Sequence, residues 1–225
     1  MTRSSSSDGS DGPLVLKAYN ILRAEILAGT AYPGQKLKID SLQKAYGFSS
    51  SPLREALNRL AIEGFVVAEG NRGFKVAPAS AADFQDIIKA RLLLEPSAIR
   101  ASIDEGTDEW GARVVADLYL LEREESRHLG GGSLDNVALY HRQKGMHLLL
   151  LSGGGSPRII SICAGLLDQT DRYIRITESY RQGPLLQAPF MKALADAVLA
   201  RDEKRSLDCL RSCIYKTAST VTAAL

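Results

Sequence analysis

Residues 37–77 constrain the fold of this chain more than any other segment. The segment runs LKIDSLQKAYGFSSSPLREALNRLAIEGFVVAEGNRGFKVA and carries apolar residues at helical spacing. Gly47 and Gly64 each follow such a repeat, and glycine readily ends a helix because it adopts the left-handed C′ conformation. Pro52 suits the first turn of a helix over Ser51–Glu63, where no backbone N–H is needed. The pattern therefore predicts two short helices joined by a tight turn.

The second of these helices has one apolar face, with Arg54, Asn58 and Arg59 off that face. The apolar residues are Leu53, Ala56, Leu57 and Leu60. Strands predicted at 65–67 and 74–76 flank the turn EGNRG. A helix-turn-helix followed by a β-hairpin is a winged helix, whose second helix enters the major groove of double-stranded DNA. A small three-helix domain that binds nothing is the alternative, since such helical hairpins are common in all-α folds.

The same segment resembles the winged helix of GntR-type bacterial transcription regulators. The resemblance is carried by SSSPLREALNRLAIEGFV and NRGFKVA, and it covers nearly all of residues 14–77. In that family arginines at the start of both helices contact DNA, whereas this chain has Asp40 and Ser50 there, so the family's sequence preference does not transfer. The DNA-contacting residues that the resemblance implies are Ser49, Ser50, Ser51, Arg54, Asn58, Arg59, Arg72 and Lys75.

These residues divide by the chemistry that they offer. Arg54 matches the arginine of the family's Arg-Glu-Ala-Leu run, and we expect it to contact a base or a phosphate. The serine hydroxyls can donate to phosphates, and Arg72 or Lys75 on the wing can reach the DNA backbone. For Arg59 we expect a solvated or phosphate-contacting role rather than base recognition.

Charge and cysteine content limit the class of protein. Residues 1–77 hold 10 Lys and Arg against 7 Asp and Glu, and the remainder holds 18 against 19, so phosphate contact is favoured at the N-terminal end. No apolar run approaches a membrane span or a signal segment, which predicts a cytoplasmic protein with no membrane partner. The three cysteines cannot form a complete disulfide set, which favours reduced thiols.

We expect three segments along the chain. Residues 1–13 (MTRSSSSDGSDGP) form a disordered tail, and residues 14–78 form the winged helix. Residues 79–225 form an all-helical domain of about six or seven helices with no strand, because apolar spacing there is helical throughout. The predicted fold class is therefore mostly α, a winged helix-turn-helix of three helices plus a β-hairpin wing followed by an all-α bundle.

The helical part resembles the FCD domain, the all-helical ligand-binding domain of the FadR subfamily of GntR regulators. The fragments that carry the resemblance are RLLLE at 91–95, MH at 146–147 with the following SGGGSPRI, and LDQTDRY at 167–173. The GGGSPRI stretch is most similar to members that often sense small carboxylic acids. The resemblance implies a central cavity for a small organic acid effector and a homodimer whose two heads bind two operator half-sites.

Many FCD domains hold a divalent metal between one Asp or Asn and three histidines. By alignment on Met146 and His147, these positions fall on Gln143, His147, Met191 and Cys213. Zn²⁺ normally needs three or four good donors, and one imidazole plus one thiolate falls short of that number. We therefore expect no cofactor, with His147 and Cys213 as the remaining candidates for a divalent metal.

Without a metal, an anionic effector needs arginine as its counter-charge, because a guanidinium binds a carboxylate through two hydrogen bonds. The candidates are Arg91, Arg172 and Arg175, with Tyr173 and His147 as neutral donors. Two of these arginines have an alternative partner at helical spacing, Glu95 for Arg91 and Asp168 for Arg172.

The motifs favour an effector-controlled transcription regulator, a repressor or an activator, over an enzyme. No Ser-His-Asp or Cys-His arrangement with supporting context, no phosphate loop and no HExxH motif is visible in the chain. A dimeric DNA-binding scaffold that has lost ligand sensing is the other alternative, because two of the three metal-binding histidines are replaced.

Overall fold

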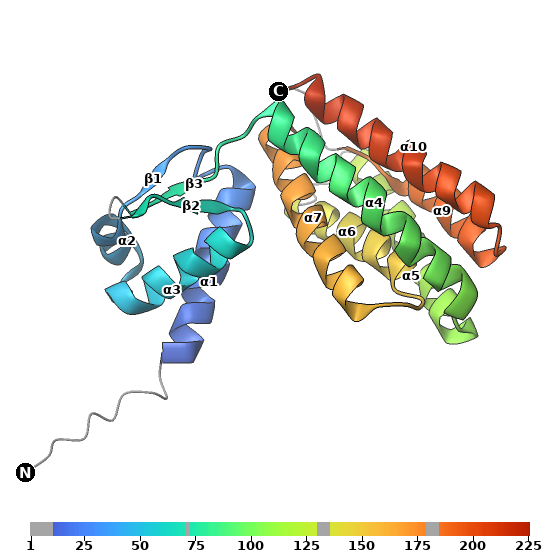
Figure 1. Ribbon diagram of the computed structural model, residues 1–225, viewed down its shortest axis with the longest axis horizontal. Coiled ribbons are helices and arrows are strands. Elements are labelled where there is room, and N and C mark those ends of the chain that lie inside the picture. Colours follow the sequence, from blue (N-terminus) through green and yellow to red (C-terminus); the bar gives the residue numbers. More distant parts are fainter. Residues whose placement is uncertain (1–10, 71–72, 130–135, 179–184) are drawn as a thin grey trace, which may run out of the picture. The chain divides into compact units, whose positions relative to one another are not determined.

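The computed structural model describes residues 11–70, 73–129, 136–178 and 185–225 (Figure 1). The chain separates into two compact units, Met1–Ala79 and Ser80–Leu225. The first unit combines helices with a small antiparallel sheet, and the described part of the second unit is helical without a strand. The predicted fold class, mostly α with a winged helix at the N-terminal end, is therefore confirmed.

The described residues of the first unit form three helices and three short strands. The helices are α1 (Asp11–Ala28), α2 (Ile39–Tyr46) and α3 (Ser50–Ile62). The strands β1 (Lys36–Leu37), β2 (Val66–Ala68) and β3 (Phe74–Val76) form an antiparallel sheet in the order β1-β3-β2. The hairpin strands were predicted to within one residue. β1 was missed because two residues are too few to show an alternating pattern.

Two predicted boundaries were wrong. α1 begins at Asp11, so residues 11–13 belong to a helix rather than to a disordered tail, while residues 1–10 lie outside the described ranges. α3 begins at Ser50 with Ser49 at the N-cap position, and the Ser49 side chain makes no capping hydrogen bond. Ser51 is thus inside the first turn, where the N–H groups are free of helical partners in any case.

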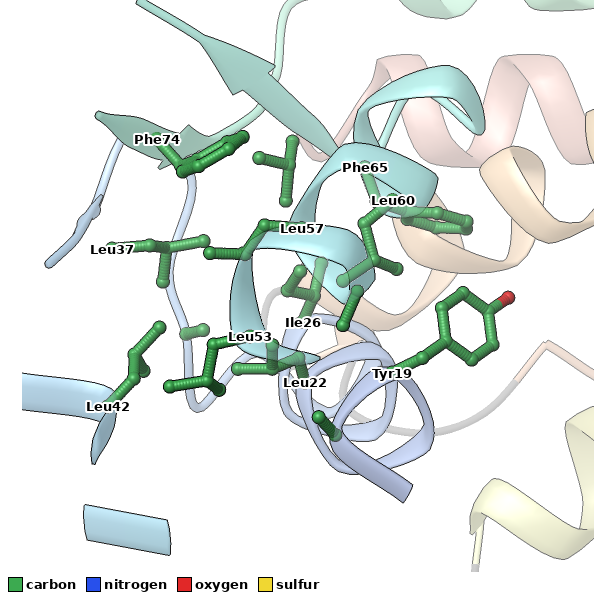
Figure 2. Packing of buried hydrophobic residues seen from close by; sticks show 14 of the residues in the cluster. Tyr19, Leu22, Ile26, Leu37, Leu42, Leu53, Leu57, Leu60, Phe65 and Phe74 are labelled. Atoms are coloured by element: carbon green, nitrogen blue, oxygen red, sulfur yellow. The ribbon is translucent and has the colours of Figure 1, made fainter. Parts of the chain in front are cut away.

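The core of the first unit forms where α3 packs against α1. The four apolar residues predicted to line the inner face of α3 are all fully buried. Figure 2 shows Leu53, Leu57 and Leu60 facing Leu22 and Ile26 of α1. The turn between α2 and α3 follows the prediction, since Gly47 takes a left-handed φ of 72° and donates its N–H to the Gln43 carbonyl at 2.9 Å. This packing fixes the polar face of α3 toward solvent.

The second unit is a bundle around the long helix α4. Its helices are α4 (Ala81–Glu105), α5 (Asp108–Leu129), α6 (Asn136–Leu151), α7 (Pro157–Ile176), α9 (Ala188–Leu199) and α10 (Glu203–Thr222). α4 packs against α7 and α10, and continues through Pro96 as one helix (Figure 1). Thr107 caps α5, because its Oγ1 accepts a hydrogen bond from the Trp110 N–H at 3.2 Å. None of the described helices is long and apolar enough to span a membrane.

The glycines at 153–155 lie tightly against the C-terminal end of α4. The Gly153 N–H donates to Ser102 Oγ at 2.9 Å, and the Trp110 indole N–H donates to the Leu149 carbonyl at 2.8 Å. A Cβ atom on Gly154 would lie 2.5 Å from the Ala101 carbonyl oxygen. Glycine is required here by close approach of backbone to backbone, so the GGGSPRI motif has a packing role.

Candidate nucleic-acid interface and buried polar site

α3, the wing and the segment before α2 surround a surface depression of about 820 Å³. α3 contributes Arg54 and Asn58, and the start of α2 contributes Asp40. The wing contributes Gly70 and Gly73, whose positive φ angles of 57° and 95° are ones that glycine adopts without strain. This concave surface brings the polar face of the predicted recognition helix next to the wing.

The structure brings most of the predicted α3 residues to the same exposed face. Arg54 and Asn58 line the depression, and Ser49, Ser50 and Ser51 are exposed at the N-terminus of α3. The first backbone N–H groups of a helix point outward there and carry a partial positive charge, which suits phosphate. α3 therefore presents hydrogen-bond donors along one line, from its first turn to Asn58.

Arg59 and Lys75 are held by neighbours outside the depression. The Arg59 guanidinium lies 4.2 Å from the ring centroid of Tyr19, and its Nε lies 3.4 Å from Oε1 of Glu63. Tyr19 donates its hydroxyl to the same carboxylate at 2.7 Å; burial and this hydrogen bond raise the pKa of Tyr19 to about 12. Lys75 Nζ lies 2.6 Å from Oε1 of Glu69. Predicted residue Arg72 lies outside the described ranges.

Two lysines that line the depression were not predicted from the sequence. Lys36 and Lys38 line it beside Arg54, and both are exposed. The signal was the pair of lysines flanking Leu37 in KLK, which alternate polar and apolar as an extended segment does. A strand of two residues is too short for its alternating pattern to be recognised. Whether the two lysines lie next to α3 depends on how the strands pair in the folded sheet.

The buried polar site of the second unit centres on the carboxylate of Glu95. Arg91 Nε donates to Glu95 Oε1 at 2.5 Å and Nη2 to Oε2 at 3.4 Å. His147 Nε2 lies 2.7 Å from Glu95 Oε2, and all three side chains are buried. Burial alone would raise the pKa of Glu95, but Arg91 and His147 outweigh it and lower the pKa to about 2. Glu95 is therefore ionised and shared between a guanidinium and an imidazole.

A cavity of about 30 Å³ adjoins this cluster, which is room enough for ordered water. It is lined by Arg91, Tyr140, Gln143, Lys144, His147, Leu167, Thr170, Asp171, Ile174, Gln187 and Thr217. Lys144 Nζ lies 2.5 Å from Oδ1 of Asp168. Like Arg91, this second cation of the lining is neutralised by a carboxylate of the protein.

The predicted effector residues fall into two groups. Arg91 and His147 line the cavity, and the pairing of Arg91 with Glu95 is the alternative that helical spacing suggested. Tyr173 does not line it, because its hydroxyl donates to Asp83 Oδ2 at 2.7 Å and accepts from the Ser80 N–H at 3.1 Å. Arg172 lies over the Tyr173 ring at 5.7 Å, and burial lowers its pKa.

Arg175 lies beside the cavity rather than in its lining. Its Nη2 lies 2.8 Å from Oδ2 of Asp171, and its guanidinium lies 5.1 Å from the ring centroid of Tyr140. Both of these partners line the cavity. Arg175 Nε is buried and has no hydrogen-bond partner among the described residues. Burial raises the pKa of Asp171 although Arg175 opposes the rise.

Glu125 on α5 is a buried carboxylate that the sequence analysis missed. It accepts hydrogen bonds from Gln143 Nε2 at 2.9 Å, from the Gln187 N–H at 2.8 Å and from the Ala188 N–H at 3.0 Å. An anion at the N-terminus of α9 satisfies N–H groups that lack helical partners and complements the helix dipole. Gln187 and Ala188 lie 62 and 63 positions from Glu125, and Gln143 lies 18 positions away, so no local pattern could reveal these contacts.

Comparison with known proteins identifies both units. Residues 14–76 match the family model of bacterial regulatory proteins, gntR family, and residues 86–216 match that of the FCD domain. The chain is 32% identical over 212 residues to the uncharacterized HTH-type transcriptional regulator BphR of Paraburkholderia xenovorans (strain LB400), covering 92% of this chain and 85% of that protein. The chain belongs to the gntR family of bacterial regulatory proteins.

Further relatives agree with this family. The chain is 31% identical over 200 residues to the HTH-type transcriptional repressor GlaR of Escherichia coli (strain K12), covering 87% of this chain and 90% of that protein. Two solved structures share the fold at 20% identity, each with a TM-score of 0.74. They are E. coli McbR/YncC, covering 93% of this chain and 97% of that one, and a putative GntR regulator from Rhodococcus sp. RHA1, covering 94% and 98%. The chain is thus a gntR-family transcription regulator with an FCD domain.

The donor set of this gntR-family regulator does not fit the divalent metal that many FCD domains hold. Gln143 is tied to Glu125 and to the Leu185 carbonyl, and His147 Nε2 faces Glu95. Burial raises the pKa of the Cys213 thiol to about 11, which disfavours the thiolate form that binds metals. Within the described ranges no three His, Cys, Asp or Glu side chains form a metal-binding group.

Proposed function

We propose that this chain binds a double-stranded DNA operator through α3 and that a small-molecule effector in the second unit controls the binding. The observation that carries the DNA half is the depression in which Arg54 and Asn58 of α3 lie beside Lys36 and Lys38. An arginine can bind the O6 and N7 atoms of guanine and an asparagine the N6 and N7 atoms of adenine. Selection from a random duplex library tests this half, and it fails if no sequence is enriched.

We propose further that the protein acts as a homodimer. One winged head makes few phosphate contacts, and specific protein–DNA complexes usually bury more surface than one small module provides. Two heads related by a two-fold axis would bind two half-sites of a near-palindromic sequence, about one helical turn apart. The spacing of the half-sites enriched in the selection tests this geometry.

For the effector we propose a small organic acid bound next to Arg91 and His147. What supports this is a cavity that places a guanidinium, an imidazole, an amide and the hydroxyls of Thr170 and Thr217 around one space. A cavity of about 30 Å³ is small for an organic acid, so ligand binding requires the cavity to enlarge. An effector that binds the form of the protein with the enlarged cavity would favour that form. The shift between DNA-competent and DNA-incompetent forms is set by the difference in the effector's affinity for them.

A second candidate function is a DNA-binding scaffold without ligand sensing. The observation that favours it is that Arg91, Lys144 and Arg175 each form an ion pair with a carboxylate of the protein. An effector carboxylate must then compete with an internal one or share its cation. In this case no small molecule would stabilise the protein or alter its DNA affinity.

Thermal shift with a panel of mono-, di- and tricarboxylates separates the two candidates. A stabilising acid whose effect is lost in Arg91→Ala or Arg175→Ala supports the effector site. Arg172→Ala is the matched control, because Arg172 is buried on α7, the helix that carries Arg175, but does not line the cavity. An acid that stabilises all three variants equally would rule out an arginine clamp.

Elemental analysis of protein purified without a His-tag tests whether the second unit binds a metal. One equivalent of metal per chain, lost in His147→Ala, would overturn our expectation that no metal is bound.

A further inference from the structure

We infer that Lys36 and Lys38 are phosphate-contacting residues that position α3 on DNA, whereas Arg54 and Asn58 carry the sequence preference. This assignment rests on the proposed DNA binding and gives the residues of the DNA-binding surface two different roles. Both lysines line the same depression as Arg54 and Asn58, although they belong to β1 and to the residue before α2.

The backbone holds the two lysines on one side. Leu37 between them is 5% exposed and pairs with Phe74 across the sheet, so it anchors the segment in the core. Side chains alternate along an extended segment, so Lys36 and Lys38 both point away from that core. Lys38 is also the N-cap residue of α2, and its carbonyl accepts the N–H groups of Ser41 at 3.1 Å and Leu42 at 3.0 Å. Their positions relative to α3 are therefore fixed by the sheet and by a helix start.

The charges of the depression favour an anion. It is lined by Lys36, Lys38 and Arg54 against one carboxylate, Asp40. Among the described residues, no carboxylate forms an ion pair with any of these three cations, in contrast to Lys75, which pairs with the nearby Glu69. A lysine is a compact point charge on a flexible stem, which suits a phosphate oxygen, whereas bidentate base recognition needs the planar fork of arginine.

The two roles predict different responses to salt and to sequence. Phosphate contacts act on every DNA sequence, and each one contributes about 0.9 to the slope of log affinity against log salt concentration. Base contacts distinguish sequences and change this slope less. Removing a lysine should therefore weaken specific and non-specific binding alike, and removing Arg54 should mainly reduce the ratio between them.

The test is fluorescence anisotropy of a labelled random-sequence duplex of roughly 30 base pairs, titrated with the full chain at several KCl concentrations. We expect Lys36→Ala and Lys38→Ala each to reduce the salt slope by about 0.9 per lost contact, and the double variant to reduce it by about twice as much as either single variant. Lys38→Arg keeps the charge and should keep the slope. Lys44→Ala is the matched control, because Lys44 is exposed on α2 outside the depression.

The outcomes separate this inference from the proposed function. If the wild type binds DNA and the double variant, folded by circular dichroism, keeps the wild-type slope, the phosphate role is overturned while DNA binding stands. The role is also overturned if Lys44→Ala lowers the slope as much as Lys38→Ala, since the effect would then be one of net charge. If the wild type binds neither a random nor a selected duplex, the proposed function fails and this inference with it.

Discussion

Nε of Arg91 lies 2.5 Å from Oε1 of Glu95, one turn further along α4, and the two side chains are only 4% and 0% exposed. Ions buried this deeply are costly to desolvate, and the cost is offset only when their hydrogen bonds are satisfied. Thr170 and His147 supply further partners at 3.4 Å and 2.7 Å. The arginine at the centre of the bundle thus already holds a carboxylate of its own chain.

Glu95→Gln should destabilise the second unit by about 3–5 kcal/mol, because it leaves the buried Arg91 charge unpaired. Urea unfolding monitored by circular dichroism measures the loss. Asp196→Asn is the control, since it breaks an exposed i,i+4 pair with Lys192 and should change stability by less than about 1 kcal/mol. Replacing both buried partners, as in Arg91→Met with Glu95→Leu, should recover much of the stability. An equally small effect in Glu95→Gln and Asp196→Asn would contradict the importance of the buried pair.

Stability should fall in acid in a way that depends on Glu95. The folded-state pKa of about 2 lies below the ordinary value of 4.5, so ionised Glu95 stabilises the fold above pH 4.5. This contribution, on the order of 3 kcal/mol, is lost as the pH falls from about 4.5 to about 2. Urea unfolding at a series of pH values should show a steeper decline for the wild type than for Glu95→Gln. Parallel curves in this window would falsify the assignment.

Gly154→Ala should destabilise the protein by about 1–3 kcal/mol, because the new Cβ would lie 2.5 Å from the Ala101 carbonyl oxygen and the backbone must move. Gly165→Ala is the matched control within α7, where a Cβ meets no atom within 4 Å. That substitution should stabilise the helix by up to about 1 kcal/mol. Thermal unfolding of both variants gives the comparison, and shifts of the same sign would argue against the close approach.

Arg54→Ala should cost about 1–3 kcal/mol of binding free energy on the selected operator if Arg54 contacts a guanine edge. The cost on a random duplex should be smaller, because base contacts are then absent. Anisotropy with both duplexes measures the two values. Unchanged operator affinity in a folded variant would remove Arg54 from the interface.

Sedimentation velocity should show a species of about twice the 24.4 kDa chain mass at micromolar concentration. The reason is that one head offers too few contacts for tight, specific binding. A monomer both with and without the selected duplex would exclude the two-headed arrangement.

The local elements of this protein follow from its sequence. Gly47 and Gly64 were each predicted to end a helix, and they take positive φ angles of 72° and 80° in the structure. The buried stripe of α3 follows in the same way from 3.6-residue spacing. Such signals act between residues a few positions apart, so they depend little on the rest of the fold. The i,i+4 pairing of Arg91 with Glu95 belongs to this class.

Only the tertiary structure decided which of these elements meet and what their side chains contact. His147 reaches Glu95 across 52 positions, Glu125 reaches the N-terminus of α9 across 62, and Lys36 joins Arg54 through a two-residue strand. The same packing brings the Tyr173 hydroxyl to Asp83 and the Arg59 guanidinium over the Tyr19 ring. The physical reason is that a polar side chain takes the partner that packing of the apolar faces brings within about 3 Å, and a linear pattern does not encode that distance.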